Sequence, residues 1–186
     1  DKEEDAYSNE YITSAAAQAL HARVALYMQD WDTAIEYASI LIDDKKNTFK
    51  LADAKTKYNA DYTFFDYMWA YDLSYEIIWR IGFTETSYGS PLGTVFLNFT
   101  KDLTYYYPDY VPATAALNLY DAADLRYSGY FAGKEQGLTI GYTNGLDWPM
   151  LVKYYGNRNF TSKLIFHVSM PKPFRLAEQY LIRAEA

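Results

Sequence analysis

The 186 residues suffice for one globular domain, and half of them are hydrophobic, as is usual for that class. The chain contains no Cys, which excludes a disulfide framework, thiolate catalysis and zinc–thiolate sites within these residues. Its formal net charge of −7 argues against a nucleic-acid partner, because binding a phosphate backbone needs clustered Lys and Arg.

Aromatic residues are unusually abundant. They make up 19% of the chain, with 21 Tyr, 10 Phe and 4 Trp. Tyr is the aromatic side chain that tolerates both a core and a wet surface, since it joins an apolar ring to a hydroxyl group. The composition therefore favours either loop-rich packing or a surface that stacks on the flat apolar faces of a ligand.

The beginning of the chain, DKEED, contains neither an initiator Met nor an apolar signal segment. We expect these residues to be part of a longer protein, whose targeting signal or lipid-modified Cys lies elsewhere. No stretch approaches the ~20 apolar residues that a membrane-spanning helix needs.

The first regular element predicted is a helical hairpin. A helix is expected over residues 14–28 and a second over residues 31–42, with Asp30 as its N-cap and Asp32 in its first turn. So short a turn requires antiparallel packing. The hairpin resembles a tetratricopeptide repeat, with small residues at Ala22 and Ala34 where the helices cross and Trp31 as the anchor of the turn.

Residues 44–172 are predicted to be a long, loop-rich insertion with short strands. Residues 76–81 read as a buried strand, with Trp79 in the core. Residues 82–110 and 133–145 contain Gly, Pro and Asn without helical period, which indicates ordered loops. A short helix is expected over residues 112–120, and a strand over residues 151–155. Residues 58–61 read only as a polar segment.

Residues 175–186, RLAEQYLIRAEA, predict a further amphipathic helix. Its expected apolar stripe comprises Ala177, Leu181, Ile182 and Ala186, and no Gly, Asn or Pro follows to cap the helix. A short helix of this kind needs an antiparallel partner, which we expect to lie beyond residue 186, so the chain alone should be poorly stable. Arg175 and Glu178 are spaced for an ion pair along the helix.

Several of these segments together resemble the SusD/RagB family. The resemblance rests on their order: the hairpin of residues 22–42, EIIW at 76–79, LYDAADLR at 119–126, Lys153-Tyr154, and the helix at 175–186. Each segment alone would be a weak signal, whereas their order and spacing are specific. The resemblance extends over nearly the whole chain, without the family's N-terminal lipoprotein Cys and C-terminal part.

The resemblance implies a mostly α fold, an α-α superhelix of tetratricopeptide-like pairs with ligand-binding loops on one side. Residues 1–186 would then be an internal fragment of one SusD-like domain, with a hairpin at 13–43, a ligand-side insertion at 44–172 and the start of a further repeat helix at 173–186. It also implies a lipid-anchored protein on the surface of the outer membrane. Such a protein binds oligosaccharide or polysaccharide without catalysis or cofactor and delivers it to a SusC-type TonB-dependent transporter.

The candidate ligand-binding residues are aromatic and amide side chains in the predicted loops, because sugar rings stack on aromatic faces and their hydroxyl groups need polar partners. Trp148 is favoured because Gly145 and Pro149 flank it with turn residues. The same rings could equally anchor long loops. The full set of candidates is Trp148, Tyr142, Tyr88, Tyr105, Tyr107, Asn98 and Asn144.

Catalytic and metal sites are not expected. Glycoside hydrolysis needs two carboxyl groups about 5 to 9 Å apart, and no spacing of carboxylates in the sequence demands that arrangement. Asp121, Asp124 and Arg126 are expected to form a helix cap with a local ion pair. His21 and His167 have no metal-ligand spacing and are expected to pack or to face solvent.

Two alternatives to glycan capture stay open at the level of the sequence. The same architecture could capture peptides, or a helical-repeat scaffold could bind only protein. The identity of a co-purified ligand would separate sugar from peptide. Replacing the loop aromatic residues with Ala would leave a pure protein scaffold functional, whereas disrupting the hairpin at Ala34 would not.

Overall fold

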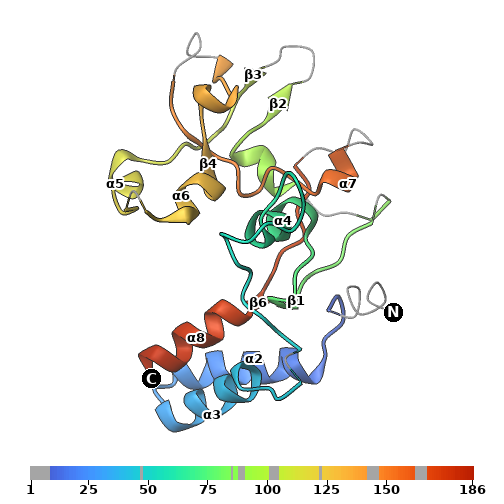
Figure 1. Cartoon of the computed structure of the whole chain (residues 1–186), viewed down its shortest axis with the longest axis vertical. Helices are drawn as coiled ribbons and strands as arrows, with labels where there is room; N and C mark the ends of the chain where they lie inside the picture. Colours follow the sequence, from blue (N-terminus) through green and yellow to red (C-terminus); the bar gives the residue numbers. More distant parts are fainter. Residues whose placement is uncertain are drawn as a thin grey trace. The chain divides into compact units, whose positions relative to one another are not determined.

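The structure is a computed structural model, and it describes residues 9–46, 48–84, 86–87, 91–100, 105–121, 123–141, 147–161 and 167–186. The chain divides into two compact units. Unit 1 comprises residues 1–53, 73–82 and 170–186, and unit 2 comprises residues 54–72 and 83–169. The fold is mostly α, as predicted, with strands of two or three residues (Figure 1). In the part of the chain described, no helix has the length and apolar character needed to cross a membrane.

Unit 1 begins with the predicted helical hairpin. Helix α2 spans Ser14–Tyr27 and helix α3 spans Trp31–Ile42. The Thr13 hydroxyl caps α2 by accepting a hydrogen bond from the Ala16 amide, and the Asp30 carboxylate caps α3 by accepting one from the Thr33 amide at 3.3 Å. Such caps satisfy amide groups that have no partner within the helix. The predicted N-cap at Asp30 is therefore confirmed.

Alanines form the seam between these helices. Ala22 of α2 and Ala34 of α3 are fully buried, as predicted for the crossing. Small side chains allow the two backbones to approach closely, and Ile182 fills the space beside them. Trp31 begins α3 as predicted, but it is 42% exposed, which is more than expected of an anchor of the turn. The buried alanines are Ala16, Ala19, Ala22 and Ala25 in α2, and Ala34 and Ala38 in α3.

Helix α8, Leu176–Glu185, lies along α2 and α3 (Figure 1). Its buried face consists of Leu176, Gln179 and Ile182. The expected stripe was therefore partly wrong, because Ile182 is buried but Leu181 is 70% exposed. The polar residue Gln179 lies between Leu176 and Ile182 on the buried face, so the hydrophobic pattern of the sequence does not reveal this face. The partner that this helix requires is supplied by α2 and α3, which precede it in the chain.

A short antiparallel pair of strands connects the pieces of unit 1. Strand β1, Ile77–Trp79, pairs with β6, Phe174–Arg175. Ile77 and Ile78 are buried, as predicted for this strand, and Trp79 packs at the edge of the same apolar cluster. The buried Glu76 carboxylate lies 2.8 Å from the Arg175 guanidinium and accepts a hydrogen bond from the Ala52 amide.

The predicted ion pair between Arg175 and Glu178 is wrong. Arg175 pairs instead with Glu76, and Glu178 pairs with Arg23 of α2, with Arg23 Nη2 and Glu178 Oε2 2.7 Å apart. Because α8 packs against α2, a long-range partner is available that helical spacing alone could not reveal. The charged residues of α8 therefore hold helices together.

Unit 2 contains short elements joined by long loops. A helix not predicted from the sequence, α4, spans Phe64–Tyr71, and its capping box joins Thr63 and Asp66. The expected helix at 112–120 shortens to α5, and the strand expected at 151–155 is wrong except at Leu151, which belongs to β5. The remaining elements are η1 (Leu92–Val95), β2 (Phe99–Thr100), β3 (Tyr105–Tyr106), α5 (Thr114–Leu117), α6 (Leu125–Tyr130), β4 (Phe131–Ala132), η2 (Lys134–Gln136), β5 (Met150–Leu151) and α7 (Arg158–Thr161).

Two antiparallel strand pairs and one apolar cluster organise unit 2. Strand β2 pairs with β3, and β4 pairs with β5. Leu97, Tyr106, Ile140 and Met150 form the buried centre. The cluster thus draws together segments up to about fifty residues apart in the chain, and it fixes the loops from which the candidate site is built.

Candidate functional site

Unit 2 contains a pocket with a volume of about 360 Å³. This size falls within the usual range of small-molecule sites, roughly 300–1,000 Å³. Aromatic and charged side chains from α4, β3 and the segment after β5 line it. The described lining residues include Tyr62, Asp66, Trp69, Tyr106, Lys153, Tyr155, Gly156 and Arg158.

Lys153, one of the lining residues, lies among three aromatic rings, of which Trp69 also lines the pocket. The Lys153 ammonium lies 4.3 Å from the centre of the Trp69 ring, 4.7 Å from that of Tyr130 and 5.2 Å from that of Tyr154. Trp69 contacts the other two rings edge to face, at 6.0 and 6.2 Å. Electron-rich ring faces attract a cation, and the attraction grows as water is excluded. We call these four residues the lysine cage.

A second cation lies against another part of the wall. The Arg158 guanidinium stacks on the Tyr155 ring, 3.9 Å from its centre. The Tyr155 hydroxyl is 3.4 Å from that of Tyr106, which donates toward it. Burial raises the pKa of Tyr106, and the hydrogen bond to Tyr155 adds to the increase. Tyr106 is therefore a neutral phenol at physiological pH.

The one carboxylate among the described lining residues, Asp66, takes part in a helix cap. Its Oδ2 atom accepts a hydrogen bond from the Thr63 hydroxyl at 2.7 Å, and the Asp66 amide donates to Thr63 Oγ1. The carboxylate also stands in the first turn of α4, where the positive end of the helix dipole favours it. Asp66 thus stabilises the start of the helix that carries Trp69 to the pocket, directly after Tyr62.

Asn157 and His167 hold in place the loop around Gly156, which lines the pocket. Buried Asn157 donates to the Tyr71 carbonyl at 3.0 Å and to the Asp72 carboxylate at 2.9 Å, which ties this loop to the end of α4. The next residue toward the N-terminus, Gly156, has a φ of 118°. A Cβ atom there would lie 2.7 Å from the His167 amide nitrogen, so only glycine fits.

A ladder of tyrosine rings runs along α4 from the pocket wall. Tyr62 lines the pocket and meets Tyr71 edge to face at 5.5 Å. Tyr71 stacks on Tyr67 at 4.6 Å, and Tyr67 stacks on Tyr58 at 3.9 Å. Burial, with the hydrogen bond to Tyr58, raises the pKa of Tyr67 to about 12. The ladder ends at Tyr58, which is 48% exposed.

Of the seven candidates proposed from the sequence, the four that the structure describes are not among the described lining residues of this pocket. Trp148 is half-buried against the cluster of unit 2, and its Nε1 atom donates to the Pro112 carbonyl at 3.0 Å. The Tyr107 ring packs against Gly141. Tyr105 and Asn98 are exposed on β3 and just before β2. Tyr88, Tyr142 and Asn144 lie outside the described residues. A binding role for these seven stays a prediction.

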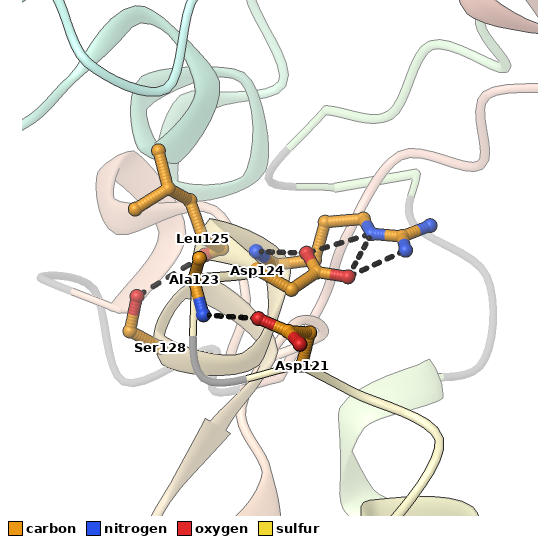
Figure 2. A network of polar contacts seen from close by, with 6 residues as sticks. Asp121, Ala123, Asp124, Leu125 and Ser128 are labelled. Atoms are coloured by element: carbon orange, nitrogen blue, oxygen red, sulfur yellow. Dashed lines mark hydrogen bonds and ion pairs between the residues drawn. The ribbon is translucent and has the colours of Figure 1, made fainter.

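The cluster of Asp121, Asp124 and Arg126 has the predicted structural role. Figure 2 shows Asp124 at the N-cap of α6, where it accepts a hydrogen bond from the Arg126 amide at 2.9 Å. The Arg126 guanidinium also contacts the Asp124 carboxylate, with Nη2 2.6 Å from Oδ2. These contacts with Arg126 hold the pKa of Asp124 below its usual value. Asp121 accepts from the Ala123 amide. Among the described residues, no group of His and carboxylate side chains could hold a metal ion.

Sequence signals for the pocket existed but were missed. Half of the residues from 58 to 71 are aromatic, a density higher than in the loops that were favoured. Thr63 and Asp66 have the spacing of a capping box, which would have placed a helix there and its aromatic residues on defined faces. In the sequence, Lys153 stands out only as part of the family resemblance, because two of the three rings around it, Trp69 and Tyr130, are far from it in the chain.

Solved structures show the same fold. No protein-family model matches the sequence, and no curated protein matches it either. The chain superimposes on a surface glycan-binding protein A from Bacteroides uniformis with a TM-score of 0.67, over 98% of this chain and 39% of that one, at 17% identity. The chain has the SusD-like fold.

Two further solved structures agree. A SusD superfamily protein from Bacteroides thetaiotaomicron matches with a TM-score of 0.66 at 20% identity, over 97% of this chain and 38% of that one. A SusD-like carbohydrate binding protein from Bacteroides vulgatus matches at 0.64 and 19% identity, over 96% and 34%. The SusD-like chain thus spans somewhat more than a third of the length of these proteins, and the resemblance proposed from the sequence is confirmed at the level of the fold.

Proposed function

We propose that this SusD-like chain binds glycans at a cell surface without transforming them. The observation that carries the proposal is the pocket of unit 2, whose walls combine aromatic rings with polar and charged groups. Sugar rings present apolar C–H faces that stack on aromatic side chains, while their hydroxyl groups need hydrogen-bond partners. Trp69 and Tyr62 supply rings, and Gln136 and Tyr155 supply polar groups at the same pocket.

The printed names of the structural neighbours support this ligand class. Two of the proteins named above are described as binding glycan or carbohydrate, one of them at a surface. The fold likeness extends over nearly all of this chain, although at low sequence identity. We therefore assign glycan as the ligand by combining the neighbours' description with the aromatic pocket.

A binding role fits the pocket better than hydrolysis. Most glycoside hydrolases use two carboxyl groups, about 5–10 Å apart, one as acid and one as base or nucleophile. Among the described lining residues, Asp66 is the single carboxylate, and it serves the capping box of α4. The buried Glu76 of unit 1 is paired with Arg175. The described lining of the pocket therefore supplies no pair of carboxylates for catalysis.

The location and the transporter partner that we propose follow from the resemblance to the SusD/RagB family. We place the parent protein at the outer membrane, attached by a lipid anchor outside these residues, with a SusC-type TonB-dependent transporter as its partner. Glycan bound by unit 2 would be released to that transporter. Co-purification of the parent protein with such a transporter from native membranes would test this partner, and its absence from purified parent protein under mild extraction would contradict it.

Isothermal titration calorimetry against a panel of oligosaccharides and peptides tests the ligand class. We expect saturable binding of at least one oligosaccharide, weakened roughly 2- to 10-fold by Tyr62→Ala, because one aromatic contact contributes about 0.5–1.5 kcal/mol. The matched control is Tyr110→Ala, an exposed tyrosine of unit 2 outside the pocket. Binding of peptides but no glycan would replace the proposal with peptide capture, and binding of neither would refute it.

A further inference from the structure

The pocket of unit 2 has a charge opposite to that of the chain. The chain as a whole has 24 acidic and 17 basic residues. The described lining residues of the pocket instead include two cations, Lys153 and Arg158, against one carboxylate, Asp66. A pocket that only stacked neutral sugar rings would need aromatic and hydrogen-bonding groups but no excess of positive charge.

The structure fixes both cations at the pocket wall. Three aromatic rings of the lysine cage surround the Lys153 ammonium, and the Arg158 guanidinium lies flat on Tyr155. Aromatic faces carry a quadrupole, so they attract a cation and hold it in place. They also remove water from its surface. An anion that reaches these groups therefore meets cations that are already partly desolvated and held in place.

The field of Arg158 extends over neighbouring groups of unit 2. Burial is the largest influence on the pKa of three neighbouring groups: it raises the pKa of Tyr71 and Tyr106 and lowers that of His167. The positive charge of Arg158 acts to lower all three. Asp66, whose carboxylate accepts hydrogen bonds from the Thr63 hydroxyl and amide, supplies one negative charge against the two cations. The formal balance of the described lining residues is one positive charge.

We propose that the pocket selects anionic sugar residues, with the acidic group placed at Lys153 and Arg158 and the sugar ring against the aromatic wall. The inference rests on the proposed function and narrows its ligand class. A planar guanidinium matches the two oxygens of a carboxylate or sulfate group, and an ammonium adds a point charge. Uronic acids and sulfated sugars share this chemistry.

The decisive test varies the ligand. Calorimetry compares polygalacturonate, alginate and chondroitin sulfate with neutral galactan, xylan and glucomannan. The best uronate ligand is then compared with its carboxyl-reduced form, and a sulfated ligand with its desulfated form. We expect a loss of about tenfold or more when the charged group is removed, the size of one charge-assisted hydrogen bond. The reduced and desulfated arms show whether carboxylate or sulfate is the group recognised.

Protein variants locate the effect. Lys153→Met and Arg158→Gln should each remove about tenfold or more of the affinity for the anionic ligand, whereas the matched control, exposed Lys45→Met in unit 1, should not change it. A thermal melt checks that each variant folds, and the ligand comparison decides the question if Lys153→Met does not. Equal binding of a glycan and its uncharged counterpart would overturn the inference and leave glycan binding intact. Binding of no glycan at all would remove both.

Discussion

At the scale of single residues, His167 shows how one side chain can organise the loops around a site. Its Nε2 atom accepts a hydrogen bond from the Phe99 amide at 3.1 Å, so Nδ1 carries the proton and donates to the Tyr155 carbonyl at 2.8 Å. Its backbone has a φ of 64°, and its carbonyl accepts from the Gly93 amide at 3.0 Å. The neutral imidazole thus joins β2 to the loop around Gly156.

Acid should therefore weaken unit 2 through His167. Burial lowers the pKa of this imidazole, so the unfolded chain takes up its proton at a higher pH than the folded one. The stabilisation is present above the unfolded pKa, about 6.5, and is lost as the pH falls through the lower folded value. We expect the free energy of unfolding, measured with urea, to fall between pH 7 and pH 5.

His167→Asn tests this origin of the acid sensitivity, because Asn tolerates a left-handed backbone better than most residues do. This variant should be less stable at pH 7 but should lose less stability on acidification. The control variant, His21→Asn, makes the same substitution at an exposed position of α2. An unchanged slope in His167→Asn would contradict the assignment.

At the scale of elements, close packing in unit 1 depends on small side chains. Ala22 of α2 and Ala34 of α3 are fully buried at the crossing, and Ile182 of α8 joins them. Protein interiors are packed to crystal-like density, so there is no free volume to receive extra methylene groups at such a seam. The ion pairs between Arg23 and Glu178 and between Arg183 and Asp43 add orientation at the surface.

Ala22→Leu should therefore destabilise unit 1. The added atoms would force the helices apart or push neighbouring side chains into strained rotamers, which costs about 1–3 kcal/mol. Urea denaturation followed by far-ultraviolet circular dichroism measures the effect. Ala17→Leu is the matched control, since it makes the same change at an exposed position of the same helix. Equal stability of the two variants would show that the seam is more adaptable than its packing indicates.

At the scale of the whole molecule, the net charge of the chain and the charge of the pocket should act on different steps of glycan binding. The net charge acts on the approach of the glycan, and the pocket acts on its final contacts. The chain has a formal charge of −7, whereas the described lining of the pocket has a positive balance. Long-range forces depend on the net charge and are screened over about 8 Å at physiological salt. Contacts inside the pocket act over shorter distances and are screened less. An anionic glycan would thus be repelled at a distance and attracted once it arrives.

The association rate of such a glycan should consequently increase with salt. Raising NaCl from 50 to 150 mM screens the repulsion, and we expect the association rate constant to rise roughly twofold or more. Stopped-flow measurement of intrinsic Trp fluorescence would follow the reaction. A neutral glycan of the same length is the control and should show no such rise. An association rate that falls with salt would mean that the positive pocket, and not the net charge, governs the approach.

Local patterns predicted local structure well. The hairpin was predictable because its small residues recur at helical spacing and because Asp30 can cap α3 through a contact three residues away. The strand at Ile77–Trp79 was predictable as a short apolar run. Helix α8 was predictable as a helix, but its buried face was not, since the choice between Leu181 and Gln179 depends on where α2 and α3 lie.

The candidate site shows where such reasoning ends. Trp148 was favoured because turn residues flank it, yet its indole bonds to the Pro112 carbonyl, thirty-six residues away in the chain. The lysine cage joins Trp69, Tyr130 and Tyr154 around Lys153, and no spacing in the sequence indicates that they meet.

The sequence by itself determined the helical class, the hairpin and the resemblance to SusD-like proteins, because helix periodicity, caps and ordered motifs depend on neighbours along the chain. Only the tertiary structure decided which aromatic rings line a pocket and which hold loops in place. The physical reason is that stacking, burial and the field of a cation depend on distances in space, and in unit 2 those distances are set by contacts between segments far apart in the chain.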